Sequence, residues 1–257
     1  MAAYREAIAW AARHDVELGL ECDVHFSADD QLICLHDLRL DRTSNATGPA
    51  FGRTVDELRM LDFGSWKLAQ PSANQRAMVT LHDLLIMVRD ARTAGIKITL
   101  AIETKHPNPR HLEIEHRVAE MLADFGWDQP GSPIRLISFS QAAITELGRI
   151  LPGLERTFLI QVTFGRWGTG ELPDGVRIVG PDLALIKRDP DFVARARAHG
   201  NEVHVWTVNR AEDIRRCRDL GVTGFTTDYP DRVETILSGR ADTRLRRATG
   251  RLRTSKR

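Results

Sequence analysis

Residues 18–37 of the chain read LGLECDVHFSADDQLICLHD. The first strand-favouring run, Leu18–Val24, continues into His25-Phe26. Only the polar run SADDQ separates it from a second run that ends at His36. Because so short a connection cannot contain a helical crossover, the two runs are predicted to form an antiparallel hairpin. This hairpin would return His36 towards the place where the first strand leaves the sheet.

Beyond the hairpin, short strand-favouring runs alternate with amphipathic helical stretches, which is typical of parallel βα units. Helices are expected at 81–92, 112–125, 141–150, 190–199 and 211–220, and residues 37–80 are expected to be an insertion. Seven runs are expected to be barrel-type strands, namely 18–24, 98–104, 134–139, 157–161, 177–180, 202–208 and 223–226. A closed (β/α)8 barrel has one strand more, and the chain opens on a helical stretch at 2–13. We therefore expect a TIM-type (β/α)8 barrel that lacks its first strand and carries a small insertion after the ECDV strand.

Composition excludes several classes of protein. The chain has 257 residues, of which 42% are hydrophobic and 28% charged, and its formal net charge is +1, so global disorder is excluded. Apolar runs are too short for a membrane span. Three cysteines without paired spacing do not form a disulfide scaffold, and the first residues lack the order of a signal peptide. These features predict a cytoplasmic protein.

Charge is unevenly distributed along the chain. Residues 240–257 contain eight Lys or Arg residues and one Asp. We expect this segment to be a basic, disordered tail that gives at most weak contact with an anionic membrane surface. Residues 1–239 are expected to form a single domain. They show no basic patch interleaved with aromatic residues, so no nucleic-acid partner is expected.

Acidic side chains occur where two predicted strands end. Glu21 and Asp23 are two residues apart, which places both carboxylates on one face of a strand, and Glu103 and Lys105 repeat this spacing. In parallel barrels the carboxyl ends of the strands carry the chemistry. Three carboxylates favour Mg²⁺ or Ca²⁺ over zinc. The structural alternative is a set of surface strand ends joined by a Glu103–Lys105 ion pair.

Two further residues are candidates for the same site. His36 ends the hairpin close to the carboxylates, where an imidazole can transfer protons near neutral pH. Trp206, on the predicted strand 202–208, either lines the pocket or packs in the core. The chain lacks the GxGxxG, GxxxxGK[ST], HExxH and GxSxG motifs, which argues against most nucleotide-binding, zinc-protease and serine-hydrolase functions.

Taken in order, the motifs of residues 1–235 resemble those of the glycerophosphodiester phosphodiesterase family. The motifs are Glu21-Cys-Asp-Val, His36-Asp37, Leu40-Asp-Arg-Thr43, Leu61-Asp-Phe-Gly-Ser-Trp66, Thr80-Leu81, Ile102-Glu-Thr-Lys105, Ser138-Phe139, Val205-Trp-Thr-Val-Asn209 and Thr227-Asp228. The resemblance implies a TIM barrel with an insertion after its second barrel strand. It also implies hydrolysis of small glycerophosphodiesters, such as glycerophosphocholine, to an alcohol and glycerol 3-phosphate with one divalent cation. This is a hydrolase activity of lipid and glycerol metabolism.

The same resemblance assigns roles by motif. It implies that Glu21, Asp23 and Glu103 are metal ligands and that His36 is one of two catalytic histidines. Lys105 would lie near the substrate phosphate, and Trp206 would border the glycerol or alcohol moiety.

The family begins with a strand that bears a His-Arg-Gly motif, followed by a Pro-Glu-Asn-Thr-like loop. This sequence starts inside the next helix, so the second histidine, a phosphate-binding arginine and one glutamate are expected to be missing and activity to be impaired. Two alternatives follow. One is a catalytically inactive relative that binds phosphodiesters or a partner chain. The other is a phospholipase-D-like hydrolase of lipid headgroups.

Overall fold

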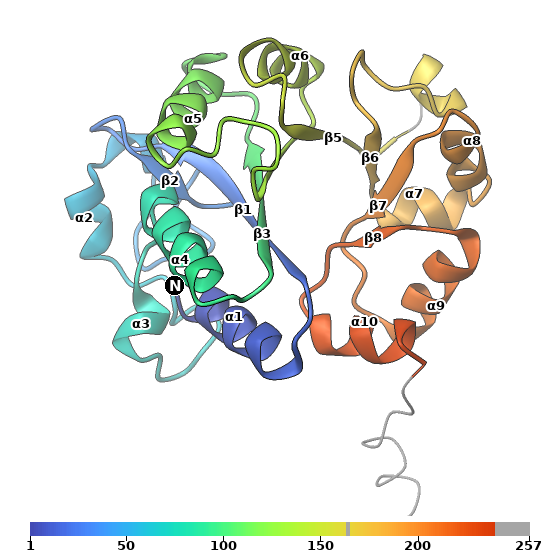
Figure 1. Ribbon diagram of the computed structural model, residues 1–257. Coiled ribbons are helices and arrows are strands. Elements are labelled where there is room, and N and C mark those ends of the chain that lie inside the picture. The colour runs from blue at the N-terminus through green and yellow to red at the C-terminus, as the bar shows by residue number, and fades with distance from the viewer. Residues whose placement is uncertain (163–164, 240–257) are drawn as a thin grey trace, which may run out of the picture. The chain divides into compact units, whose positions relative to one another are not determined.

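The computed structural model describes residues 1–162 and 165–239 (Figure 1). These residues form two compact units. The first contains residues 1–158 and 173–176, and the second contains the described residues of 159–172 and those from 177 onward. The expected basic tail, 240–257, lies outside the described residues, and the single domain 1–239 stays a prediction.

In the first unit the strand order is β2-β1-β3-β4-β5. The pairs β1–β3, β3–β4 and β4–β5 are parallel, whereas β2 pairs with β1 in the antiparallel sense. β5 begins in this unit and ends in the second. The elements are α1 (Ala2–His14), β1 (Leu18–Phe26), β2 (Leu32–Cys34), η1 (Ala50–Gly52), α2 (Val55–Arg59), α3 (Ala73–Arg76), α4 (Leu81–Thr93), β3 (Ile98–Thr104), α5 (Glu113–Asp124), β4 (Ile134–Ser138), α6 (Gln141–Ile150) and β5 (Glu155–Ile160).

The hairpin β1–β2 is confirmed. Val24 pairs with Cys34 and Phe26 with Leu32. The turn is closed by the backbone N–H of Ser27, which donates to the carbonyl of Gln31 at 2.9 Å. Asp30 has a φ of 61° there, a left-handed conformation that Asp tolerates better than most residues.

Helix α4 shows how the first unit buries its apolar side chains. Thr80 and Asp83 form a capping box in which each side chain accepts a hydrogen bond from the other residue's backbone N–H, and this fixes the start of the helix. Leu84 and Val88 then lie on one face and are fully buried, in the same cluster as Cys22 of β1. Burying each leucine or valine contributes about 2 kcal/mol. α4 packs against β2 and β3 (Figure 1), so the residues of β1 that alternate with Glu21 and Asp23 belong to this core.

The insertion, 37–80, contains the short helices η1, α2 and α3, which the sequence did not predict. It packs around an apolar cluster that includes Leu40, Val55, Leu58 and Met78 together with Ile33 of β2. α2 begins at a Thr54–Glu57 capping box. The insertion therefore packs on β2, the strand that ends two residues before His36.

The second unit continues the alternation of strands and helices, with strand order β6-β7-β8. The backbone N–H of Asp182 donates to the carbonyl of Ile160 at the end of β5, at 2.9 Å. The elements are η2 (Gly165–Thr169), β6 (Ile178–Pro181), α7 (Leu183–Arg188), α8 (Phe192–Ala198), β7 (Glu202–Val205), α9 (Ala211–Leu220), β8 (Gly224–Phe225) and α10 (Pro230–Leu237).

The βα order of the two units confirms the predicted TIM-barrel-type fold. Strands β7 and β8 are shorter than expected, and α7 and α10 were not predicted. None of the described helices combines the length and the apolar character that crossing a membrane requires.

Candidate functional site

Three carboxylates meet where β1 and β3 run side by side. Glu21 and Asp23 project from one face of β1 because residues two apart on a strand share a face. Glu103 of β3 pairs in register with Asp23. Ligand oxygens of these three residues, the acidic cluster, all lie within 4.8 Å of one another. The structure therefore brings together the three acids that the sequence singled out.

Lys105 lies against the acidic cluster. Its Nζ is 2.8 Å from Oδ1 of Asp23 and 2.8 Å from Oε1 of Glu103. The Glu103–Lys105 ion pair named as the structural alternative is thus present, and it also includes Asp23. The side chain of Lys105 is only 15% exposed. Its ammonium therefore supplies one positive charge against three carboxylates, in a place where water screens charges weakly.

Burial and mutual repulsion disfavour the ionised form of these acids. Burial, together with the neighbouring charges of Asp23 and Glu103, raises the pKa of Glu21 to about 8. Burial also raises the pKa of Glu103 to about 7, against the opposing effect of Lys105. The single positive charge of Lys105 is therefore not enough to keep all three carboxylates ionised at neutral pH.

A divalent cation fits these residues. Carboxylate oxygens are the ligands that Mg²⁺ and Ca²⁺ prefer, and one ion would supply the charge that Lys105 leaves missing. The acidic cluster could hold a metal ion on this geometry.

The chain just before His36 is bonded to the backbone of β1 at Asp23. The N–H of Leu35 donates to the carbonyl of Asp23 at 3.0 Å, so His36 follows directly on a residue bonded to β1. Its imidazole is exposed, and Nδ1 lies 2.7 Å from Oδ1 of Asp37. Asp37 in turn accepts hydrogen bonds from Nε and Nη2 of Arg42 at 2.6 and 3.0 Å. The Arg42 guanidinium holds the pKa of Asp37 well below its usual range, so this carboxylate stays charged and can orient the imidazole.

The sequence pattern alone did not predict a role for Asp37, Arg42 or His25. Asp37 and Arg42 lie within motifs that carried the resemblance. His25 is two residues beyond Asp23 on the same face of β1, and that spacing is the signal that points to it. It is only 4% exposed, and burial lowers its pKa. Its Nε2 lies 3.4 Å from the carbonyl oxygen of His36, which ties it to the candidate catalytic residue.

Trp206 belongs to the second unit. Its indole N–H donates to the carbonyl of Gly180 at 2.7 Å, and its own carbonyl accepts from the N–H of Leu183 at 2.7 Å. The indole is therefore bonded to β6, and the backbone of Trp206 is bonded to the first residue of α7, within that unit. Contact between Trp206 and a substrate stays a prediction.

Comparison with known proteins identifies relatives along most of the chain. A relative from Mycobacterium tuberculosis (strain ATCC 25618 / H37Rv), named "Probable glycerophosphodiester phosphodiesterase 1", is 34% identical over 232 residues, which are 87% of this chain and 84% of the relative. A glycerophosphodiester phosphodiesterase of Bacillus subtilis (strain 168) is 28% identical and aligns over 86% of this chain and 76% of its own.

Solved structures share the fold. A glycerophosphodiester phosphodiesterase from Parabacteroides distasonis superimposes with a TM-score of 0.70 at 25% identity, over 87% of this chain and 85% of its own. A phosphodiesterase from Oleispira antarctica, solved in complex with its product sn-glycerol-3-phosphate, superimposes with a TM-score of 0.70 at 19% identity, over 90% and 89% of the two chains. Residues 1–232 match the model of the glycerophosphoryl diester phosphodiesterase family. With that match and a relative above 30% identity, the chain belongs to the glycerophosphoryl diester phosphodiesterase family.

Proposed function

We propose that this protein hydrolyses glycerophosphodiesters to an alcohol and glycerol 3-phosphate, with one divalent cation, Mg²⁺ or Ca²⁺, held by Glu21, Asp23 and Glu103. The observation that carries the proposal is the acidic cluster, whose ligand oxygens lie within 4.8 Å of one another. Membership of a phosphodiesterase family and the product found in the Oleispira antarctica structure support this substrate class.

The cation would neutralise charge on the phosphoryl oxygens as the phosphorus is attacked. The chain's own residues supply positioning and proton transfer. Lys105 is held by Asp23 and Glu103 at 2.8 Å, where an ammonium favours a bound phosphate.

His36 is the proposed proton carrier. In hydrolysis the oxygen of water bonds to phosphorus and the bond from phosphorus to the departing oxygen breaks, so water loses a proton and the departing alkoxide gains one. The contact between Nδ1 of His36 and Asp37 leaves Nε2 as the nitrogen that exchanges protons with water or the alkoxide. Asp37, held in place by Arg42, keeps the hydrogen of the neutral imidazole on Nδ1.

The test is release of glycerol 3-phosphate from glycerophosphocholine by the purified protein with Mg²⁺ or Ca²⁺, followed by a coupled dehydrogenase. Glu21→Gln removes one proposed ligand without changing side-chain size and is expected to abolish both turnover and binding of the cation in calorimetry. Glu17→Gln is the matched control, because Glu17 is exposed just before the same strand.

Folded wild-type protein that releases no glycerol 3-phosphate with either cation would overturn the proposed activity. Full turnover by Glu21→Gln would overturn the metal assignment instead. Cleavage of lysolipids with glycerophosphocholine left intact would favour the phospholipase-D-like alternative. Cytoplasmic location and contact between the basic tail and a membrane stay predictions.

A further inference from the structure

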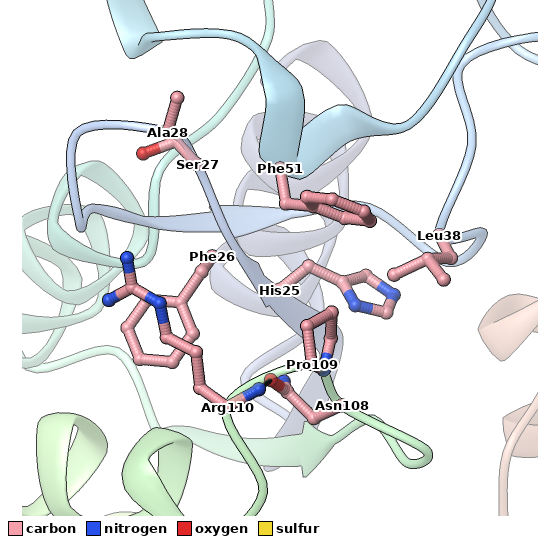
Figure 2. Close-up of a pocket in the computed structure, with 9 residues that line it drawn as sticks. All are labelled: His25, Phe26, Ser27, Ala28, Leu38, Phe51, Asn108, Pro109 and Arg110. Carbon is pink, nitrogen blue, oxygen red and sulfur yellow. Dashed lines mark hydrogen bonds between the residues drawn. The ribbon is translucent and has the colours of Figure 1, made fainter.

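A cavity of about 160 Å³ lies within the first unit, at the end of β1 (Figure 2). Its walls come from the end of β1, the turn that follows, the insertion and the loop between β3 and α5. Phe51 and Leu38 of the insertion line it, and both are more than a third exposed despite being apolar. Figure 2 shows the ring of His25 between Phe51 and Pro109.

This cavity continues the two strands that carry the carboxylates. His25 follows Asp23 by two residues on the same face of β1, which corresponds to about 7 Å along the strand. The opposite wall, which includes Pro109 and Arg110, begins three residues after Lys105. Starting from the acidic cluster, the cavity therefore lies along the direction in which β1 continues, within reach of a substituent on a phosphate held at the cluster.

One polar atom of the lining residue His25 lacks a hydrogen-bond partner among the described residues. Nε2 of His25 contacts the carbonyl oxygen of His36, and since a carbonyl only accepts, Nε2 carries the hydrogen. In the neutral ring this leaves Nδ1 as an acceptor. Among the described residues no group hydrogen-bonds to this nitrogen, although it is buried. A buried acceptor without a donor is costly, so the site favours a ligand that provides one.

The other polar side chains that line the cavity already make hydrogen bonds or ion pairs. The Ser27 hydroxyl bonds Asp29 and the Gln31 backbone, and the Asn108 side-chain oxygen accepts from the backbone N–H of Arg110. Arg110, the one formally charged lining residue, is paired with Asp30 and lies 4.6 Å from the ring of Phe26. The lining contains no carboxylate to compensate a buried cation, so a charged ammonium headgroup is disfavoured relative to an uncharged one.

We propose that this cavity binds the alcohol moiety of the diester and selects small uncharged alcohols that carry a hydroxyl group, with Nδ1 of His25 accepting the hydroxyl hydrogen. Apolar contact with Phe51, Leu38 and Pro109 covers the carbon atoms of the alcohol. Glycerophosphoglycerol, whose second alcohol is a neutral polyol, is the expected preferred substrate over glycerophosphocholine. The inference rests on the proposed hydrolysis and adds its preferred substrate.

The experiment compares kcat/KM for glycerophosphoglycerol and glycerophosphocholine in the wild type and in two variants of His25. A Gln side chain places its amide where Nε2 lies and so keeps the contact with His36, whereas an Asn side chain places its oxygen where Nδ1 lies. One neutral hydrogen bond is worth roughly threefold to tenfold in selectivity. We therefore expect His25→Gln to lose a preference of that size, and His25→Asn to keep the preference while it lowers both rates.

Binding of the two diesters is measured in parallel by calorimetry in the presence of a chelator, where no turnover is expected. The same preference should appear in Kd and should be lost in His25→Gln. Equal kcat/KM and equal Kd for the two diesters in the wild type would overturn the inference while leaving the hydrolytic function intact. Absence of turnover together with selective binding would overturn the hydrolytic function and support only the part of the inference that concerns selective binding of the alcohol by the cavity. Stronger binding of glycerophosphoethanolamine than of glycerophosphoglycerol would also refute it, because an ammonium would then be the recognised group.

Discussion

Replacing Glu21 by Gln is expected to stabilise the metal-free protein at alkaline pH, although it removes a proposed functional group. Glu21 lies in the acidic cluster with Asp23 and Glu103, and burial together with their charges raises its pKa from 4.5 to about 8. Gln has nearly the same volume and no charge. The variant therefore keeps the packing and removes the repulsion.

The magnitude follows from the pKa of Glu21. An acid whose pKa rises on folding binds more protons in the folded state, so its contribution to the free energy of unfolding falls as the pH rises from 4.5 to about 8. At pH 7 the folded state must keep this carboxyl protonated, about 2.5 pH units above the pKa of the unfolded chain, which costs roughly 3 kcal/mol. For a chain of this size, roughly 3 kcal/mol corresponds to a change in Tm of about 6–12 °C.

The assay is thermal unfolding of wild type, Glu21→Gln and the exposed control Glu17→Gln between pH 5 and 8, with chelator and then with millimolar Mg²⁺ or Ca²⁺. With chelator, the Tm of Glu21→Gln should equal that of the wild type at pH 5 and exceed it at pH 8. With the cation the order should reverse, because ligand binding stabilises only the protein that retains the site. Two results would refute the electrostatic account of the acidic cluster. One is a Tm of Glu21→Gln below that of the wild type at pH 8 with chelator, and the other is an increase in Tm on adding the cation that is as large in Glu21→Gln as in the wild type.

Three further outcomes are expected. Lys105→Met should lower the Tm of the metal-free protein strongly, because removing one partner of a buried ion pair costs about 3–5 kcal/mol, and the cation should restore more of that Tm than it adds to wild type. Arg42→Gln should lower the free energy of unfolding at pH 7 by only about 0.5–1 kcal/mol, since the guanidinium is half exposed. Because Arg42 holds the pKa of Asp37 low, this difference in the free energy of unfolding should begin to shrink as the pH falls below the usual pKa range of an aspartate and should be lost only below the lowered pKa of Asp37, as urea unfolding would show. Gly64→Ala should destabilise the insertion by about 1–3 kcal/mol, because an added Cβ would lie 2.7 Å from a backbone carbonyl oxygen, whereas Gly52→Ala meets its nearest neighbour at 3.6 Å and should be close to neutral in calorimetry.

Local pattern was sufficient for much of the fold. The SADDQ turn is too short for a crossover, which made the β1–β2 hairpin predictable, and alternation of apolar runs located β3, α6 and α9 to the residue or nearly so. The helices of the insertion were missed because four or five residues do not show a helical period, and their start depends on capping boxes such as Thr54–Glu57.

The sequence by itself determined which acids can share a site. The spacing of Glu21 and Asp23 fixes their common face through the two-residue period of a strand, whatever surrounds them. Only the tertiary structure decided that Glu103 pairs in register with Asp23, that Lys105 bridges the two, and that Nδ1 of His25 is buried without a donor. Strand register and the burial of a single atom depend on contacts between residues some eighty positions apart, and no local period in the sequence encodes them.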